Sequence, residues 1–311
     1  MEEKPSMSKN EKPVPSGLIL LRKESGTTSF DSLKVIKRAL GSGKAGHTGT
    51  LDKFAEGLLL VLTGKALKLS RWFTHCDKRY EGTIRFGAET DTLDPEGACV
   101  AEAPLPSRAM VELALERFRG KIEQAPPAYS ALHINGERAS TLARRGEAPE
   151  MKKRPVEVYA LELASWDPPF AGISVHCSSG TYIRSLARDI ALAAGSRAHL
   201  SALLRTRVAG FRIEDAFAPG SGESFLLPRP LDRATFVALG LPCLEADPEQ
   251  ARKIALGKLL RETIGATALD RLDSGSPGAR SFAVFSGDSL LAVIERDGET
   301  APWKYGHVYS C

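Results

Sequence analysis

Cysteine is scarce in this sequence, and the few cysteines present are not arranged for a metal site or a disulfide framework. They are far apart, odd in number and never in a CxxC pair. A structural zinc site or a set of disulfides needs paired thiols at characteristic spacings. We therefore expect ordinary reduced thiols and no metal ligands at Cys76, Cys99, Cys177, Cys243 and Cys311.

Long apolar runs are also lacking. No stretch approaches the ~20 consecutive apolar residues that cross a membrane. The beginning of the chain, MEEKPSMSKNEKPVPSG, lacks the apolar core of a signal peptide. We therefore expect a cytoplasmic protein with no membrane partner. Residues 1–14 are polar, charged and interrupted by proline, which predicts a mobile tail.

The sequence does contain enough apolar material for a substantial core. Hydrophobic residues make up 42% of the 311 residues, and a chain of this length suggests one large domain and a small one. A loop-rich stretch at 218–233 falls near the end of the larger unit. We expect a main domain over residues 15–240 and a small terminal domain over residues 241–311.

The net charge of +4 is too small to identify a polyanionic partner, but the distribution of charge is more informative. Lysine and arginine dominate three separate segments, at residues 33–72, 138–154 and 184–212. Together these segments could form a surface that follows phosphates. Three solvated basic faces are the alternative, and charge alone slightly favours that alternative.

Hydrophobic periodicity predicts the first elements of the main domain. Residues 17–21 form a short apolar run typical of a buried strand. A helix capped by Thr28 or Ser29 follows and ends before Gly41. Its apolar positions at helical spacing are Phe30, Leu33, Ile36 and Leu40. The next segment, residues 41–52, is too rich in glycine to be regular structure.

Later segments complete an α+β pattern. Strands are predicted around residues 80–86, 156–158 and 173–177, and helices over residues 107–118 and 181–195. Residues 281–296 contain two apolar runs around a Gly-Asp turn, which indicates a hairpin. This hairpin predicts that the small terminal domain is rich in β-structure.

Asp52 is the first candidate for chemistry, because it follows a glycine-containing loop that permits close approach to a ligand. An aspartate beside a turn is, however, more often a helix cap or a turn former. The loop is not a phosphate-binding P-loop, since it lacks the GK[ST] pattern in the required frame. His47 is equally ambiguous, because no second metal ligand lies four residues away.

Tyr80, Tyr182 and Arg184 come from distant segments and could form a uridine pocket with Asp52. The tyrosines would stack on a base and the arginine would hold the carboxylate, although packing is the more usual role of aromatic residues. His176 and Cys177 do not form a thiol catalytic pair, since neighbours on a strand point to opposite faces.

Four sequence blocks, in order between about residues 17 and 212, resemble the bacterial TruB family of tRNA pseudouridine-55 synthases and its dyskerin-type relatives. The blocks are GHTGTLDKFAEGLLLVLTGKALKLS, KRYEGTIRFGAETDTLDPEG, QAPPAYSALHINGERASTLARRG and CSSGTYIRSLARDI. One block alone could be a coincidence, but four in the same order make another family improbable. Two departures flank the aspartate: Lys53 replaces the usual proline and Glu56 the usual threonine. They affect expectations for substrate-loop contacts more than for catalysis.

The resemblance implies a pseudouridine-synthase fold, with a mixed, mainly antiparallel sheet and a central cleft, followed by a PUA-like RNA-binding domain at 241–311. It implies that Asp52 is the catalytic aspartate, paired with Arg184, and that Tyr80 and Tyr182 line the active site. Residues 124–155 resemble the mobile thumb loop of the family. From this loop we expect substrate contacts at Arg144, Arg145, Lys152 and Lys153.

The implied reaction isomerises the uridine at position 55 in the T-arm loop of tRNA, and it needs no cofactor because no atoms are gained and no redox change occurs. Asp52 could attack covalently or abstract the C2′ proton to give a glycal, and the sequence leaves both open. His47 is expected to fill the space of the flipped base. The resemblance also implies a monomer without an obligate protein partner.

Two competing functions remain. One is a guide-RNA-dependent, dyskerin-like subunit that modifies rRNA, although the chain has no long lysine-rich tail. The other is a non-catalytic protein that binds RNA or assists tRNA folding. The presence of Asp52, Tyr80, Tyr182 and Arg184 together argues against loss of catalysis.

Overall fold

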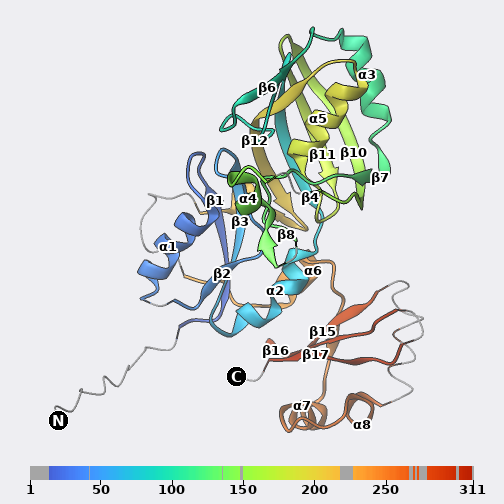
Figure 1. The fold of residues 1–311 in the computed structure, drawn as a ribbon. Coiled ribbons are helices and arrows are strands. Elements are labelled where there is room, and N and C mark those ends of the chain that lie inside the picture. The colour runs from blue at the N-terminus through green and yellow to red at the C-terminus, as the bar shows by residue number, and fades with distance from the viewer. Residues whose placement is uncertain are drawn as a thin grey trace, which may run out of the picture.

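Two sheets organise the computed structural model, a large one of nine strands and a small one of four (Figure 1). The structure describes residues 14–41, 43–134, 136–147, 150–217, 227–265, 269, 272, 279–298 and 301–309. The predicted tail lies outside these residues except for residue 14, as does much of the predicted loop at 218–233. Within the described ranges, no helix combines the length and apolar character needed to cross a membrane.

The large sheet forms the main body of the protein. Its strands are β1 (Gly17–Lys23), β2 (Ala45–His47), β3 (Glu56–Thr63), β4 (Lys78–Phe86), β7 (Gly120–Gln124), β10 (Arg154–Asp167), β11 (Phe170–Cys177), β12 (Ala198–Val208) and β13 (Phe211–Arg212). The order along the sheet is β1-β3-β12-β4-β11-β10-β7, with β2 paired to β3 and β13 to β12. Only β12 and β3 pair in parallel among these strands. The predicted mixed, mainly antiparallel sheet is therefore confirmed.

Over β4, β10 and β11 one face of this sheet is buried and the other is largely polar, because side chains alternate along these strands. β1 and β3 are instead buried on both faces. On β4, Tyr80 and Ile84 are buried while Glu81 and Arg85 are exposed. Two helices, α3 (Arg108–Glu116) and α5 (Ile183–Ala193), pack on the buried face (Figure 1). Both helices were predicted, and α5 contributes Leu186 to the shared core.

The first helix, α1 (Ser29–Ala39), starts at the predicted cap, since Thr28 Oγ1 accepts the Asp31 N–H at 3.0 Å. Its buried face contains Leu33 and Ile36, but Phe30 is 61% exposed although it belongs to the predicted apolar set. Ser29 occupies the buried position instead, because its hydroxyl exchanges two hydrogen bonds with the Leu51 backbone. Phe30, one residue later, is thereby turned to the surface.

Part of the glycine-rich segment is regular, contrary to the sequence-based expectation. Ala45–His47 form strand β2, which pairs antiparallel with Val61–Thr63 of β3. β12 pairs only with the first two residues of β3, so the rest of that side of β3 has backbone groups that can order a short neighbouring segment whatever its glycine content. This pairing fixes the start of the loop that leads to Asp52.

The small sheet contains β14 (Cys243–Glu245), β15 (Ser281–Ser286), β16 (Ser289–Glu295) and β17 (Lys304–Val308) in that order. β15 and β16 form the predicted hairpin. Helices α7 (Pro248–Ala255) and α8 (Leu260–Ile264) pack on one face, while Phe285 and Val293 share a core with Phe73 of the main body. The two sheets are therefore joined by continuous apolar packing.

The remaining elements are short connections. They are η1 (Gly64–Leu69), α2 (Ser70–Thr74), β5 (Ala88–Thr90), β6 (Cys99–Glu102), β8 (His133–Ile134), β9 (Glu137–Arg138), α4 (Ala139–Arg144), η2 (Ile213–Asp215) and α6 (Arg233–Ala238). Helix α2 reaches the small sheet, where Trp72 Nε1 donates to Ser281 Oγ at 3.3 Å. The third of the four sequence blocks contains the hairpin β8–β9, and the second contains β5, which pairs with β6 just after the block.

Candidate active site

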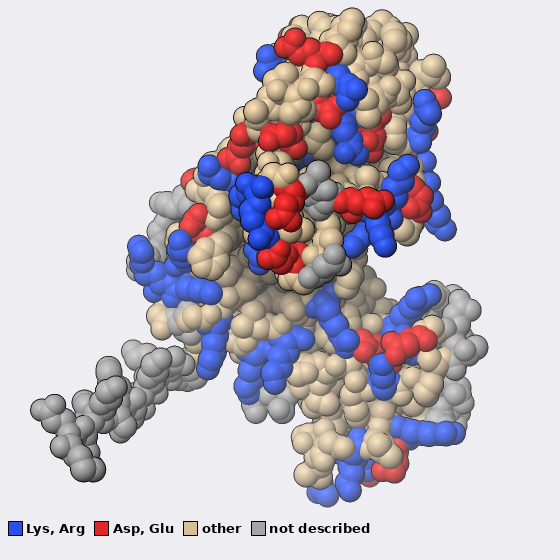
Figure 2. All heavy atoms as spheres, in the orientation of Figure 1, with Lys and Arg blue, Asp and Glu red and all other residues tan. Residues whose placement is uncertain are grey.

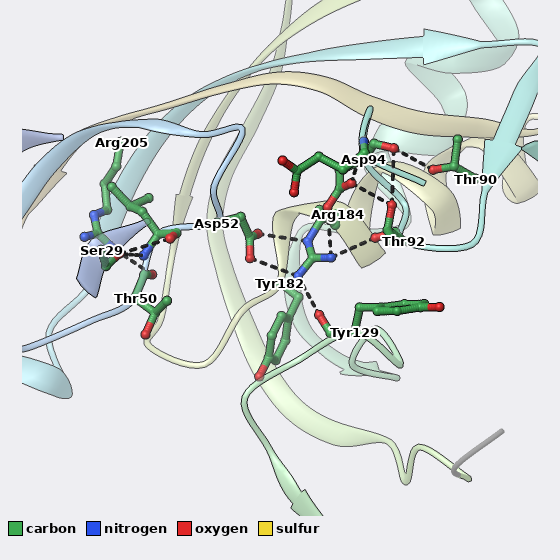
Figure 3. Close-up of polar contacts among 12 residues, drawn as sticks. Ser29, Thr50, Asp52, Thr90, Thr92, Asp94, Tyr129, Tyr182, Arg184 and Arg205 are labelled. Atoms are coloured by element: carbon green, nitrogen blue, oxygen red, sulfur yellow. Dashed lines mark hydrogen bonds and ion pairs between the residues drawn. The ribbon is translucent and has the colours of Figure 1, made fainter. Parts of the chain in front are cut away.

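Asp52 and Arg184 meet at the end of the loop between β2 and β3. Arg184 Nε lies 2.8 Å from Asp52 Oδ2, and Arg184 Nη2 donates to Oδ1 at 3.0 Å (Figure 3). Both carboxylate oxygens are thus held by one planar guanidinium, which fixes the orientation as well as the charge of the carboxylate. The Asp52 side chain remains 35% exposed, whereas that of Arg184 is 5% exposed. The carboxylate is therefore the reachable member of the pair.

Arg184 is itself held on its other side. Nη1 donates to the Thr92 carbonyl at 2.7 Å and to Asp94 Oδ2 at 3.2 Å, and Nη2 donates to the Tyr129 carbonyl at 3.0 Å (Figure 3). Asp94 is buried, and its Oδ1 accepts from Thr92 Oγ1 at 2.6 Å. The guanidinium therefore lies between two carboxylates in a fixed frame.

Opposing influences act on the pKa of Asp52. Burial raises the pKa of Asp52, and the nearby Asp94 carboxylate raises it further, while Arg184 and Lys23 act to lower it. A carboxylate with a raised pKa is a better proton acceptor and a better nucleophile than an ordinary surface aspartate. Arg184 offsets the penalty of burial and keeps the charged form accessible.

Two buried cations hold the loop that carries Asp52. Lys23 Nζ donates to the carbonyls of Ala55 at 2.5 Å, Glu24 at 3.0 Å and Lys53 at 3.3 Å. Burial lowers the pKa of Lys23 to about 8. This lysine stabilises the chain immediately after Asp52.

Arg205, on β12, holds the other side of the loop. Its Nε donates to the Leu58 carbonyl at 2.7 Å and its Nη2 to the Gly49 carbonyl at 3.2 Å. A side chain at Gly57 would collide with the Arg205 backbone, since an added Cβ would lie 2.4 Å from the Arg205 carbonyl oxygen. The glycine therefore permits the parallel contact of β3 and β12 that brings this arginine under the loop.

Tyr80 lies on β4 within the same core cluster as Leu51 and Ala55, the neighbours of Asp52 on the loop. Burial raises the pKa of Tyr80 to about 12, although the Arg205 guanidinium beside it acts in the opposite direction. The phenol is therefore neutral at physiological pH, and its ring forms part of the buried wall next to Asp52.

Tyr182 immediately precedes α5 and is the N-cap residue of that helix. Its ring lies next to the Asp52–Arg184 pair (Figure 3), and burial raises its pKa. The structure thus brings Asp52, Tyr182 and Arg184 into one site, with Tyr80 in the wall behind the loop.

His47 lies on β2, five residues before Asp52, and is partly buried. Burial and the Arg205 charge lower the pKa of His47, so the imidazole is neutral at pH 7. Its Nδ1 is buried without a hydrogen-bond partner among the described residues. A neutral ring with one unsatisfied nitrogen is compatible with stacking on, or hydrogen bonding to, an incoming base.

The four predicted thumb residues are all exposed and none of them contacts Asp52. Arg145 pairs with Glu137 and Glu147 on the same segment. Arg144 ends α4, and Lys152 and Lys153 precede β10. In Figure 2, basic and acidic side chains adjoin over the position of α4, so this surface is mixed rather than uniformly basic.

Two further features of this region are its potential metal-ligating side chains and a cavity beside the loop. No group of three or more His, Cys, Asp or Glu residues is placed to hold a metal ion within the described ranges. A cavity of about 530 Å³ opens beside the loop and is lined in part by Phe54, Glu56 and Glu81. None of the predicted site residues lines this cavity. This cavity is therefore separate from the Asp52–Arg184 pair.

Sequence reasoning missed Lys23, Asp94, Gln124 and Arg205. Lys23 could have been noticed as a charged residue at the end of an apolar run, and Asp94 as an acid in the second block. Gln124 could have been noticed as the first residue of the third block. The contacts of Gln124 and Arg205 gave no sequence signal, because their partners are backbone groups contributed by distant segments.

Comparison with known proteins identifies the family. Residues 37–183 match the family model described as TruB family pseudouridylate synthase (N terminal domain). A Borreliella burgdorferi protein named tRNA pseudouridine synthase B is 46% identical over 206 residues, covering 65% of this chain and 73% of that protein. An Aromatoleum aromaticum protein of the same name is 39% identical over 272 residues, covering 85% and 87%.

Solved structures agree at the level of the fold. The structure titled "Crystal Structure of a Cbf5-Nop10-Gar1 Complex" matches with a TM-score of 0.66 at 22% identity, covering 96% of this chain and 85% of that chain. At this identity the match shows the fold alone, and it confirms the predicted pseudouridine-synthase architecture. The sequence matches go further: the chain belongs to the TruB family of pseudouridylate synthases.

Proposed function

We propose that this protein is a tRNA pseudouridine synthase that isomerises the uridine at position 55 in the T-arm loop. The observation that carries the proposal is the accessible Asp52 carboxylate held at both oxygens by the buried Arg184. Relatives that are 39% and 46% identical are named tRNA pseudouridine synthase B, which supports the assignment of tRNA as the substrate.

The reaction breaks the N1–C1′ bond of uridine, rotates the uracil and forms a C5–C1′ bond. The proton on C5 is lost and N1 gains a proton, so no atoms are added and no cofactor is required. Asp52 either attacks the sugar or base covalently, or removes the C2′ proton to form a glycal. Arg184 keeps the carboxylate charged and oriented in both routes.

Tyr80 is the candidate for the transfer of the C5 proton. With a pKa of about 12 its phenol is protonated, so it can accept a proton only while its own proton leaves. Tyr182 contributes a ring at the entrance to the same site (Figure 3). Together the two tyrosines provide apolar surfaces that retain the detached uracil.

The target uridine must leave its stack before reaction, at a cost of a few kcal/mol. We infer that His47 occupies the vacated space or stacks on a neighbouring base. Replacement of His47 by alanine is expected to weaken binding or slow single-turnover modification of tRNA. Wild-type behaviour of His47→Ala in both assays would contradict this role.

Residues 124–155 are proposed to act as the thumb that covers the RNA stem-loop, with Arg144, Arg145, Lys152 and Lys153 near phosphates. The small sheet and its helices are proposed to form a PUA-like RNA-binding domain over residues 241–311, attached to a catalytic domain over residues 15–240. The enzyme is proposed to act in the cytoplasm as a monomer without an obligate protein partner.

The decisive experiment measures tritium release from C5-labelled uridine in a tRNA transcript. Wild-type protein and Asp52→Asn are compared at matched tRNA binding, with Asp31→Asn on the surface of α1 as a control. Release by wild type and Asp31→Asn, but not by Asp52→Asn, is expected because the reaction needs the Asp52 charge. Release by none of them would contradict a stand-alone tRNA synthase and favour a guide-dependent or purely RNA-binding protein.

A further inference from the structure

Gln124 is the last residue of β7. Both polar atoms of its side-chain amide form hydrogen bonds to the backbone of one distant residue, Tyr182. Its Oε1 accepts the Tyr182 N–H at 2.8 Å, and its Nε2 donates to the Tyr182 carbonyl at 3.1 Å. The Gln124 side chain is buried, with 2% of the residue exposed. The amide thus pairs with the Tyr182 backbone as a neighbouring strand would.

The contact with the Tyr182 backbone is important because α5 begins directly after this residue. Tyr182 makes no side-chain capping hydrogen bond, and its carbonyl also accepts the Leu186 N–H at 3.0 Å in the first turn. Arg184 lies two residues further on and projects from the same turn. A shift of the Tyr182 backbone would therefore move both the tyrosine ring and the guanidinium that holds Asp52.

Gln124 also marks the base of the proposed thumb. The next carbonyl, on Ala125, accepts from Arg188 Nη2 at 3.4 Å, and the Tyr129 carbonyl accepts from Arg184 Nη2 at 3.0 Å. Residues 124–129 thus contact the first two turns of α5 at three points. Gln124 is the only one of the three that contributes a buried side chain with two hydrogen bonds to one residue.

We propose that Gln124 is a positioning residue that aligns Tyr182 and Arg184 with Asp52 from the base of the thumb. This inference rests on the proposed function, because alignment matters only if the site performs chemistry. The competing explanation is that Gln124 merely satisfies two buried backbone groups during folding. The two explanations differ in whether the properties of Asp52 change in a folded variant.

The test compares wild type with Gln124→Met, which keeps the length of the side chain but removes both hydrogen bonds. Gln124→Glu keeps the acceptor for the Tyr182 N–H. Ser196→Ala is the matched control, since the Ser196 side chain is also buried and donates to a distant backbone group, the Pro104 carbonyl at 2.7 Å, but lies beyond the far end of α5. Each protein is assayed for melting temperature, tRNA affinity and single-turnover rate at saturating enzyme.

For Gln124→Met we expect the single-turnover rate to fall about 100-fold while tRNA affinity changes by less than about threefold. Gln124→Glu should lose less, and Ser196→Ala should keep the wild-type rate. The acidic limb of the pH–rate profile of Gln124→Met should move to higher pH by about one unit. Arg184 and Lys23 favour the ionised Asp52 while Asp94 opposes it, so loosening Arg184 makes the carboxylate harder to ionise.

A second readout does not depend on the reaction. The ¹³C chemical shift of the Asp52 carboxyl is followed with pH in the free proteins, with Asp52→Asn used to assign the signal. A midpoint in Gln124→Met above that of wild type supports the proposal even if no uridine is modified, whereas absence of wild-type activity counts against the proposed function alone. An unmoved midpoint, a rate within threefold of wild type, or failure of both Gln124 variants to fold would overturn the proposal.

Discussion

The cations around Asp52 and the cations of the proposed thumb differ in almost every physical respect. Lys23, Arg184 and Arg205 are buried and donate to fixed carbonyl or carboxylate oxygens. Lys152 and Lys153 are exposed and form no ion pair among the described residues. Buried donors in a low-dielectric frame define geometry, whereas exposed charges attract a polyanion at long range and are screened by salt.

This comparison implies that the two groups control different measurable quantities. Replacing a buried cation should change the rate of the bound complex with little effect on the salt dependence of binding. Replacing exposed cations should change the salt dependence with little effect on that rate. The following substitutions test whether buried cations control the rate and exposed cations control the salt dependence of binding.

The largest effect is expected for Arg184→Met. Loss of the guanidinium leaves Asp52 and Asp94 facing each other without a cation between them, so the pKa of Asp52 should rise further. Since the ionised carboxylate is the reactive form, the rate falls as pH decreases through this pKa, and the acidic limb should shift to higher pH. We expect single-turnover rates at least about 10³-fold below wild type near neutral pH.

Arg108→Met, on the exposed surface of α3, serves as the control for this replacement. The measurement is quench-flow single turnover across pH 5 to 9 with saturating enzyme. A wild-type pH profile for Arg184→Met would remove Arg184 from the control of Asp52.

A smaller loss of rate is expected for Arg205→Lys. A single ammonium cannot reach the Leu58 and Gly49 carbonyls together, so one side of the Asp52 loop loses its support. We expect the single-turnover rate to fall about 100-fold and the melting temperature to decrease, with an unchanged salt slope for tRNA binding. If the salt slope changed instead, Arg205 would belong with the RNA-contacting cations.

The opposite pattern is expected when Arg144, Arg145, Lys152 and Lys153 are all replaced by alanine. The slope of log affinity against log salt should decrease by about 0.9 for each phosphate that the variant no longer neutralises, while the rate at saturation stays near wild type. Arg108→Ala on the distant helix α3, combined with Arg117→Ala at the C-cap of that helix, is the control. An unchanged slope in the fourfold variant would exclude these residues from the RNA interface.

The smallest effect is expected at Lys53, the residue that follows Asp52. Its ammonium lies 3.0 Å from Glu96 Oε1, but both side chains are about half exposed. Exposed pairs of this kind contribute about 1 kcal/mol or less. Lys53→Ala should therefore unfold at nearly the wild-type denaturant concentration, and a large loss of rate without a loss of stability would reveal a direct substrate contact.

Much of the fold could be predicted because its signals are local. Alternation of apolar residues located β4, β10 and β11, and helical spacing located α1, α3 and α5, with a capping residue before the first two of these helices. The Gly-Asp turn located the hairpin of the small sheet. Local signals failed where a distant segment decided the outcome: β3 orders β2 despite its glycine, and Ser29 rather than Phe30 contacts Leu51.

The residues of the candidate site likewise divide into those that sequence signals identified and those that only the tertiary structure revealed. The four ordered sequence blocks alone indicated the family and singled out Asp52, Tyr80, Tyr182 and Arg184, because the types and order of reactive side chains are written in the chain. Only the tertiary structure revealed the frame that Lys23, Asp94, Gln124 and Arg205 build around them. Most partners of these residues are backbone carbonyls and amides, which every residue possesses, so a sequence cannot show which of them a buried side chain will meet.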